Sequence, residues 1–261
     1  MADDQEAAEV TVTVTDGVGT VIFNRPERRN ALDAELVDAI GRAFDRLEAD
    51  ESVRCVVVTG AGRAFSAGAV LDTLIASADG EFDSVVQVYE GFLRVLRSPL
   101  PTIAAVNGPA VGAGLNIALA CDVRIASTAA SFDSRFPTLR LHPGGGHSWL
   151  LGRAVGRQTA TLMALFGETL DATAALREGL VAAVYEPDEL LAAADALARR
   201  VRDMDRSLVE KQVDTLRRAE QTVAHADILA LETDRQRWST AQPEFVRNTR
   251  ELQERISEGR R

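Results

Sequence analysis

The sequence predicts an α/β fold in which short buried strands alternate with amphipathic helices. Apolar runs rich in β-branched residues recur at Cys55–Thr59 and from Thr102 onward, and such runs are typical of strands buried on both faces. Both runs are followed by turns rich in glycine and other small residues, which end the strands. The alternation has no fixed sequence period, which argues against a solenoid of identical repeats.

Length, net charge and hydropathy exclude several classes of protein. The chain has 261 residues and a net charge of −10, with a pI near 4.9, which argues against nucleic acid or an anionic membrane as the main partner. No apolar run is long enough to span a bilayer. Residues 1–9 are acidic and lack the features of a signal peptide, so we expect a frayed tail and a cytoplasmic protein.

Cysteine and histidine usage gives no sign of a metal centre. Cys55 and Cys121 lie near apolar strands and are expected to be buried, reduced thiols. The three histidines show no metal-ligand spacing. Ser66 and Ser148 are not followed by the pattern of a nucleophile elbow, so a serine hydrolase triad is not predicted.

The N-terminal third predicts a hairpin and a helix. Val10–Val14 and Thr20–Phe23 flank the turn at 16–19, which is the pattern of a β-hairpin. Asp33 is a good N-cap for a helix. The apolar face of that helix is Leu36, Val37, Ile40, Phe44 and Leu47.

Helices are also predicted further along the chain. Val85–Leu96 follows a polar segment at 77–81, which is expected to be a mobile loop. From residue 187 onward, three amphipathic helices are predicted at 188–202, 207–225 and 243–256. Their exposed apolar residues would need a partner surface; these are Leu208, Leu216, Ile228 and Trp238.

The stretch 102–126 is the centre of the predicted fold. A buried strand is followed by the turn Asn107-Gly108-Pro109, and Gly112-Ala113-Gly114 opens a short apolar helix. The first N–H groups of a helix have no partner within it and favour an anion or a developing oxyanion. Glycines at a helix start also serve packing alone. The segment 56–70 repeats the arrangement of a strand followed by a loop of small residues, and two such donors together could hold one carbonyl oxygen.

Three motifs resemble the crotonase (enoyl-CoA hydratase/isomerase) superfamily. They are Asn24-Arg25-Pro26 with Asn30-Ala31-Leu32, the loop from Gly60 to Ala69, and Ala-Val-Asn-Gly followed by Gly-x-Gly; Pro143-Gly144-Gly145-Gly146 also fits. The resemblance covers about residues 9 to 190 in order.

The resemblance implies a fold, a substrate and an assembly. The fold would be a crotonase-like right-handed spiral of ββα turns over residues 1–190, with a helical oligomerisation region over 191–261 that builds trimers or hexamers. The partner would be an acyl-CoA thioester of fatty acid metabolism, with no cofactor beyond the coenzyme A of the substrate. The region of Val85–Leu96 would line the acyl pocket or be a surface helix.

The resemblance also assigns residues to the site. The family stabilises thioester enolates with two backbone amides, which fall here on Ala69 and Ala113, and the amide of Gly144 would help to hold the reacting water. Ala113 stands where many members have glycine. The residues implied for binding coenzyme A are Arg29, Ala31, Ala64, Ala67, Ala69, Val70, Leu71 and Asp72.

The sequence departs from the family at both catalytic glutamates. Asn116 stands at the first position, on the same helical face as Ala113. Counting back from Pro143 puts Phe136 at the second position. An amide positions water or a carbonyl but takes up no proton at neutral pH, and a phenyl ring transfers none. Both family bases are therefore missing.

Other polar residues are candidates for the proton transfer that the missing glutamates would perform. His142 precedes Pro143-Gly144 and has a suitable pKa for proton transfer, although a histidine there is also commonly a packing residue. His147 would open the next helix, where the dipole disfavours imidazolium. Asp122 is interpreted as framework. Arg140 would pair with Asp133 or with a ligand.

Three hypotheses follow. The chain is a crotonase-type lyase or isomerase with an unusual base, an acyl-CoA-binding protein that has lost its proton-transfer groups, or an assembly scaffold. We favour an enoyl-CoA hydratase-like protein that binds CoA thioesters, with weak or altered chemistry, because the oxyanion loops are intact while both carboxylates are replaced.

Overall fold

The structure is a computed structural model that describes residues 9–71, 73 and 82–221. The chain divides into two compact units, residues 1–203 and residues 204–261. In the second unit the described element is α9 (Arg206–Gln221), on which Leu216 is exposed. The predicted loop at 77–81, the predicted helix at 243–256, and Asp72, Ile228 and Trp238 lie outside the described residues.

The first unit is organised around a six-stranded sheet of order β1-β2-β3-β4-β6-β9. β1 and β2 are antiparallel, with Val10 opposite Phe23, which confirms the predicted hairpin. The other neighbours are parallel. The strands are β1 (Val10–Thr15), β2 (Val18–Phe23), β3 (Cys55–Gly60), β4 (Thr102–Val106), β6 (Val123–Ser127) and β9 (Val184–Tyr185).

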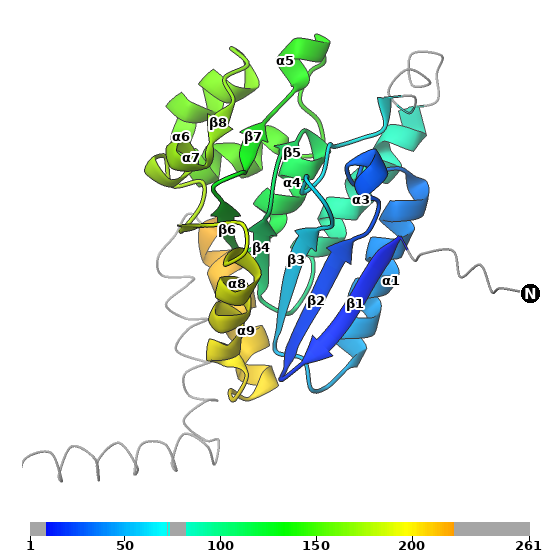
Figure 1. The fold of residues 1–261 in the computed structure, drawn as a ribbon, viewed down its shortest axis with the longest axis vertical. Coiled ribbons are helices and arrows are strands. Elements are labelled where there is room, and N and C mark those ends of the chain that lie inside the picture. The colour runs from blue at the N-terminus through cyan, green and yellow to red at the C-terminus, as the bar shows by residue number, and fades with distance from the viewer. Residues whose placement is uncertain (1–8, 72, 74–81, 222–261) are drawn as a thin grey trace, which may run out of the picture. The chain divides into compact units, whose positions relative to one another are not determined.

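A second sheet of three short strands lies beyond the carboxyl ends of the first (Figure 1). It contains β5 (Ala110–Val111), β7 (Ser131–Asp133) and β8 (Leu170–Asp171). The chain passes from β4 to β5 and then into a helix, and again from β6 to β7 and then into helices. Each turn therefore places one strand in each sheet before a helix, which is the expected ββα spiral.

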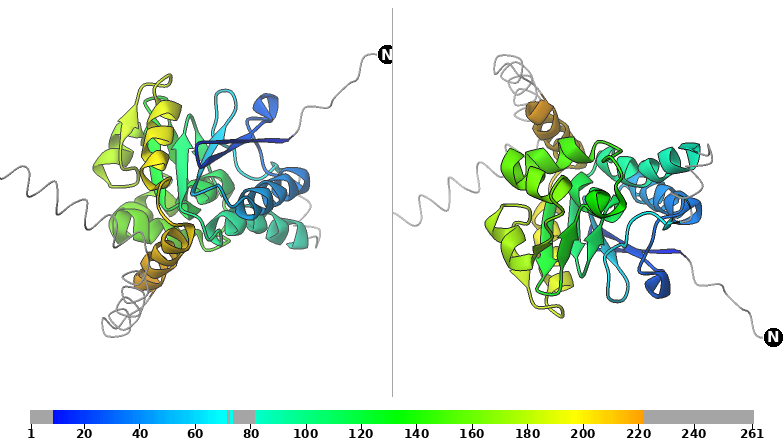
Figure 2. Two further views of the ribbon diagram at one scale, coloured as in Figure 1. Left: turned by 90° about the horizontal axis from the view of Figure 1, so that it is seen from below. Right: turned by 90° about the horizontal axis from the view of Figure 1, so that it is seen from above.

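Helices cover both faces of the large sheet (Figure 2). α1, α3 and α4 lie on one face, and α8 lies against β3, β4 and β6 on the other. The helices of this unit are α1 (Ala34–Ala49), α3 (Phe82–Leu96), α4 (Ala113–Ala120), α5 (Phe136–Leu139), α6 (His147–Ala164), α7 (Ala172–Arg177) and α8 (Leu190–Ala198), with short 3-10 helices at Pro26–Arg28 and Arg199–Val201.

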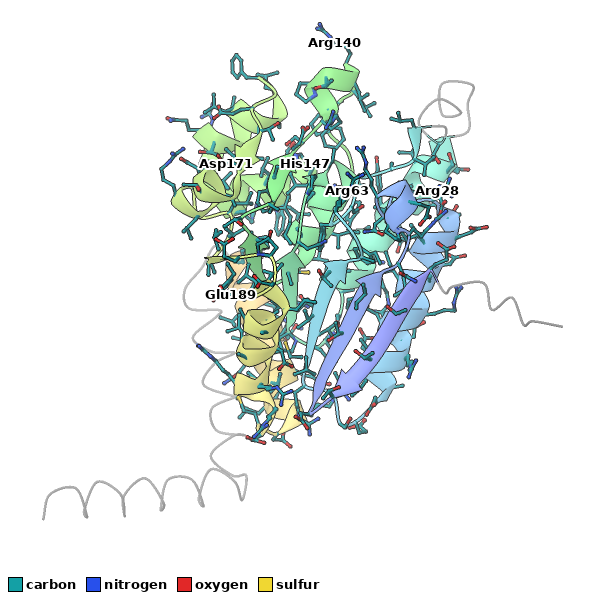
Figure 3. All side chains as sticks on the ribbon, in the orientation of Figure 1. Arg28, Arg63, Arg140, His147, Asp171 and Glu189 are labelled. Atoms are coloured by element: carbon teal, nitrogen blue, oxygen red, sulfur yellow. The ribbon has the colours of Figure 1, made fainter. Side chains whose placement is uncertain are left out.

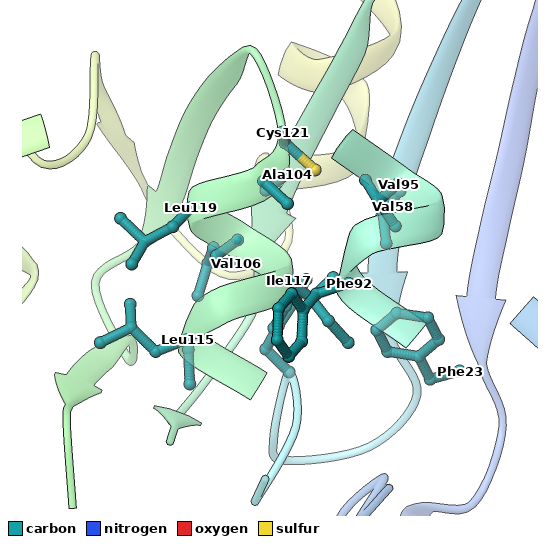
Figure 4. Packing of buried hydrophobic residues seen from close by; sticks show 14 of the residues in the cluster. Phe23, Val58, Phe92, Val95, Ala104, Val106, Leu115, Ile117, Leu119 and Cys121 are labelled. Carbon is teal, nitrogen blue, oxygen red and sulfur yellow. The ribbon is translucent and has the colours of Figure 1, made fainter. Parts of the chain in front are cut away.

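The core explains why the strand sequences are apolar without a polar alternation. Val56 and Val58 of β3 pack towards α1, α3 and α4, whereas Cys55 and Val57 pack towards α8. Successive side chains of a strand point to opposite faces, so a sheet covered on both faces needs apolar residues at every position. Figure 4 shows the larger of these layers, in which Phe92 of α3 meets α4.

Local predictions are confirmed in the same region. Asp33 caps α1, and its Oδ1 accepts a hydrogen bond of 3.1 Å from the Leu36 amide. Asp122 is framework, because its Oδ2 accepts hydrogen bonds from the amide and hydroxyl of Thr102. Cys55 and Cys121 are buried free thiols. Among the described residues, no helix is long and apolar enough to cross a membrane.

Candidate active site

The loop after β3 is held by one buried asparagine. Asn30 has a φ of 55°, and its Nδ2 lies within 3.2 Å of the carbonyl oxygens of Ala61, Ala64 and Phe65. Its Oδ1 accepts a hydrogen bond of 2.9 Å from the Arg25 amide. An asparagine tolerates a positive φ better than most residues. The first sequence motif therefore fixes the shape of the second.

Two glycines bring this loop against the start of α4. A β-carbon on Gly68 would lie 2.5 Å from the Val111 oxygen and 3.4 Å from the Ala113 nitrogen, and one on Gly114 would lie 2.5 Å from the Ser66 oxygen. No β-carbon fits at 2.5 Å from a backbone oxygen. The absence of a side chain at both positions thus allows the loop and the helix start to lie in contact.

The amides of Ala69 and Ala113 are available to a ligand. Ala69 forms an isolated parallel β-bridge with Leu32, and the hydrogen bonds of this bridge are donated by the Leu32 and Val70 amides. Ala113 is the first residue of α4, and its N–H has no partner in the helix. Within the described part of the chain neither N–H donates a hydrogen bond. Two unsatisfied donors therefore lie beside the same loop contact.

Both alanines line an inner cavity of about 320 Å³. Its wall is mostly apolar, and its polar members are few. The apolar side chains include Val85, Val88, Phe92, Leu139 and Leu141, and the polar ones include Asn116, Ser134, Tyr89, Arg135 and His142. An apolar cavity with a few convergent polar groups is the usual form of a small-molecule site.

A wider outer cavity of about 920 Å³ shares Ala67, Ala69 and Leu71 with the inner one. Four arginines line it in a chain of net negative charge, namely Arg28, Arg29, Arg63 and Arg135. Arg28 and Arg135 form ion pairs with Asp33 and Asp133. The Arg29 and Arg63 guanidinium groups form no ion pair with any described residue, and Figure 3 labels Arg28 and Arg63 near the carboxyl ends of β2 and β3.

Three buried polar side chains are joined by hydrogen bonds, and two of them, Asn116 and Ser134, line the inner cavity. The Nδ1 atom of His147 lies 2.7 Å from Asn116 Oδ1, and its Nε2 atom lies 2.9 Å from Ser134 Oγ. All three residues are at most 2% exposed. Because a carbonyl oxygen only accepts, Nδ1 carries the imidazole proton, and Nε2 accepts the hydrogen bond of the Ser134 hydroxyl.

The environment keeps His147 neutral. Burial lowers the pKa of His147 from 6.5 to about 4, because a desolvated imidazolium is costly. The helix dipole, invoked from the sequence, acts in the same direction at the first residue of α6. The Phe136 ring packs on the imidazole at 4.9 Å between centroids. Phe136, at the position expected for a catalytic glutamate, therefore forms part of the apolar surroundings of His147.

The other residues predicted around Pro143 lie nearer the surface. His142 is exposed and lines the inner cavity, and its Nδ1 lies 2.7 Å from the Pro143 oxygen. Gly144 packs against Tyr89, whose hydroxyl would lie 2.3 Å from a β-carbon at that position. The role of His142 as a base and that of Gly144 in holding water stay predictions.

Of the two partners predicted for Arg140, Asp133 is wrong, and a ligand stays a prediction. Asp133 forms its ion pair with Arg135 at 2.7 Å, not with Arg140, because Arg135 follows on the turn directly after β7. Figure 3 shows Arg140 extending outward at the end of α5.

Sequence reasoning missed the hydrogen bonds that join Ser134, His147 and Asn116. Ser134 and His147 are 13 residues apart, and His147 and Asn116 are 31 residues apart, so no spacing rule connects them. One feature of the sequence could have indicated this group. Asn116 replaces the family glutamate, and a buried polar side chain at that position needs a hydrogen-bond partner. At the outer cavity the sequence predicted Arg29 but missed the other three arginines, Arg28, Arg63 and Arg135.

Comparisons with known proteins agree with this architecture. The family model of enoyl-CoA hydratase/isomerase matches residues 13–254. A Mycobacterium tuberculosis protein named "Probable enoyl-CoA hydratase EchA14" is 47% identical over 209 residues, which are 80% of this chain and 81% of that protein. The 1,2-epoxyphenylacetyl-CoA isomerase of Escherichia coli is 37% identical over 72% of this chain and 74% of its own.

Among solved structures, an enoyl-CoA hydratase from Bacillus anthracis superposes with a TM-score of 0.89 at 26% identity, covering 95% of this chain and 96% of that one. The chain therefore belongs to the enoyl-CoA hydratase/isomerase family and has the crotonase fold.

Proposed function

We propose that this chain binds an acyl-CoA thioester and polarises its carbonyl between the amides of Ala69 and Ala113. The observation that carries the proposal is the pair of amides without a hydrogen-bond partner among the described residues, both at the wall of one apolar cavity. Such donors stabilise an oxygen on which negative charge develops. Family membership supports a CoA thioester as the ligand.

The two cavities suit the two ends of that ligand. The inner cavity would take the acyl group, because Val85, Val88 and Phe92 give it an apolar wall. The outer cavity would take the phosphate-bearing part of coenzyme A beside Arg29 and Arg63, whose guanidinium groups are not engaged by the described carboxylates. Arginine suits phosphate because its planar fork donates several hydrogen bonds.

The chemistry of the family would be weak or altered here. Asn116 is fixed by His147, and Phe136 packs on the same imidazole. Neither side chain can exchange a proton with the carbons next to the thioester. Ordinary hydration or isomerisation that depends on two glutamates is therefore not expected at ordinary rates. The protein would act in the cytoplasm as a homotrimer or hexamer.

A second candidate is an acyl-CoA-binding protein without catalysis. Among the described residues, no aspartate or glutamate lines the inner cavity. This observation favours binding alone over standard hydratase chemistry, and it leaves the ligand unchanged.

Calorimetric titration with butyryl-CoA tests the ligand, and a spectroscopic assay of crotonyl-CoA hydration tests the chemistry. We expect butyryl-CoA to bind and crotonyl-CoA to be hydrated far more slowly than by a family member that retains both glutamates. Failure to bind would refute the proposal. Hydration at the rate of that reference enzyme would refute the claim that the missing carboxylates matter.

Restoring the carboxylates separates the two candidates. The double variant Asn116→Glu with Phe136→Glu should gain hydration if the oxyanion site is competent and the acid/base groups alone are missing. The single variant Phe136→Leu is the matched control, because it opens the same wall without adding an acid. A double variant that binds butyryl-CoA but gains no hydration would favour binding alone.

A further inference from the structure

Ser134, His147 and Asn116 are arranged like the three members of a hydrolytic triad. A hydroxyl lies 2.9 Å from an imidazole nitrogen, and the other nitrogen lies 2.7 Å from a side-chain oxygen that fixes the ring. The tautomer is the one that can take the hydroxyl proton. Nucleophile, base and orienting group are recognised by these roles and distances, whatever their order in the chain.

Ser134 lines the same cavity as Ala113, one of the two proposed oxyanion donors. β5 and β7 are parallel neighbours with Val111 opposite Asp133, and the Gly112 amide donates to the Asp133 oxygen at 2.8 Å. Ser134 directly follows β7, Ala113 comes two residues after the end of β5, and both residues line the inner cavity. A thioester held at Ala113 would thus have its carbonyl carbon in the cavity that Ser134 lines.

We infer that Ser134 is the nucleophile of a thioester hydrolase, with His147 as its base and Asn116 as the residue that positions the imidazole. This inference rests on the proposed function, because it requires an acyl-CoA thioester in the inner cavity. The substrate class is a CoA thioester with an apolar acyl group, and the second substrate is water. The reaction needs none of the carboxylates that the family uses.

The steps balance with water as the co-reactant. Ser134 Oγ bonds to the thioester carbon while its proton passes to His147 Nε2, and the charge forms on the oxygen between the two amides. The carbon–sulfur bond breaks, and the thiolate of coenzyme A takes the proton from His147. Water then adds to the ester on Ser134 and gives a proton to His147. The carbon–Oγ bond breaks, the serine takes this proton, and a carboxylic acid leaves.

Saturated acyl-CoA esters test the inference without interference from hydration, because they carry no double bond. Incubation of the protein with butyryl- and hexanoyl-CoA should release free thiol, measured with a chromogenic disulfide. Both cysteines are buried, so they contribute little background signal. Ser134→Ala should bind butyryl-CoA as the wild type does but lose at least ~10³-fold in rate.

Two readouts distinguish catalysis from a structural role of the trio. Intact-mass measurement of Ser134→Cys with butyryl-CoA should reveal an acyl adduct, mapped by proteolysis to residue 134. Asn116→Asp should raise the hydrolysis rate by about tenfold or more, since a carboxylate stabilises the imidazolium better than an amide does. A trio that only filled the wall would show no adduct and no gain.

The outcomes separate this inference from the proposed function. No binding of butyryl-CoA by the wild type would overturn both. Binding without thiol release or adduct would overturn the hydrolase alone and leave the binding site standing. Thiol release that survives in Ser134→Ala would also overturn it, because another group or free water would then be the nucleophile.

Discussion

The two halves of the candidate site are built from different parts of the chain. The proposed oxyanion half uses the main-chain amides of Ala69 and Ala113, whose positions are set by close backbone contacts at Gly68 and Gly114. The half that faces the neighbouring carbons uses side chains, and there Asn116, Ser134 and His147 form one hydrogen-bonded group. The first half fits the family pattern, and the second departs from it.

This contrast shows which features of a site can change without loss of the fold. Amides held by the spiral move only if the backbone moves, and a β-carbon at Gly68 or Gly114 would already overlap with backbone atoms. Side chains at the wall can be exchanged as long as each buried polar group finds a partner. In the proposed function the substrate class therefore follows from the backbone, whereas in the inferred hydrolase the reaction follows from three side chains.

The largest expected effect comes from moving the backbone. In Gly114→Ala the new β-carbon would lie 2.5 Å from the Ser66 oxygen, so the start of α4 must shift away from the first loop. We expect turnover of the thioester that the wild type processes best to fall about 10²-fold or more, as when one oxyanion donor is removed. Turnover within threefold of wild type would show that these amides do not form the oxyanion site.

The next largest effect is the pH dependence of the free energy of unfolding that His147 is expected to cause. Burial lowers the pKa of His147 to about 4 from an ordinary 6.5. Between these values the unfolded chain binds a proton that the folded chain does not, so the free energy of unfolding falls as the pH falls. From about pH 7 to pH 5 this histidine should cost about 2 kcal/mol of stability.

Urea unfolding of the wild type and of His147→Gln at both pH values measures this difference. Glutamine retains hydrogen-bonding atoms but does not titrate, so its stability should fall by about 2 kcal/mol less over the same interval. An equal pH dependence of the two proteins would show that the imidazole titrates normally in the fold.

The sequence was informative where local chemistry decides the structure. The hairpin, the Asp33 cap and the two loops after strands follow from short patterns, and the structure has each of them. The partner of Asn116 could not be found in this way. Sequence reasoning turned to His142 because it adjoins Pro143, but the start of α6 places the next histidine beside Asn116 instead. Such contacts depend on how two helices pack.

A smaller effect is expected at the outer cavity. Arg63→Ala removes an exposed guanidinium without an ion pair among the described residues, and we expect the affinity for butyryl-CoA to fall about tenfold, or ~1.4 kcal/mol, at low salt. The affinity for butyryl-pantetheine, which lacks the nucleotide phosphates, should not change. Arg97→Ala, an exposed arginine paired with Glu90, is the control. Equal losses for both ligands would show that Arg63 supports the fold or the acyl end.

The smallest expected effect is that of adding a methyl group at Gly41, which the site does not require, in contrast to Gly114. Gly41 lies within α1, and a β-carbon there would meet no atom within 4 Å. Gly41→Ala should therefore stabilise the protein by about 0.5–1 kcal/mol, because alanine loses less conformational freedom on forming a helix. Chemical denaturation measures this gain, and thioester turnover should not change. A loss of turnover as large as that of Gly114→Ala would show that the fold tolerates no added methyl group, and the effect at Gly114 could then not be assigned to the oxyanion amides.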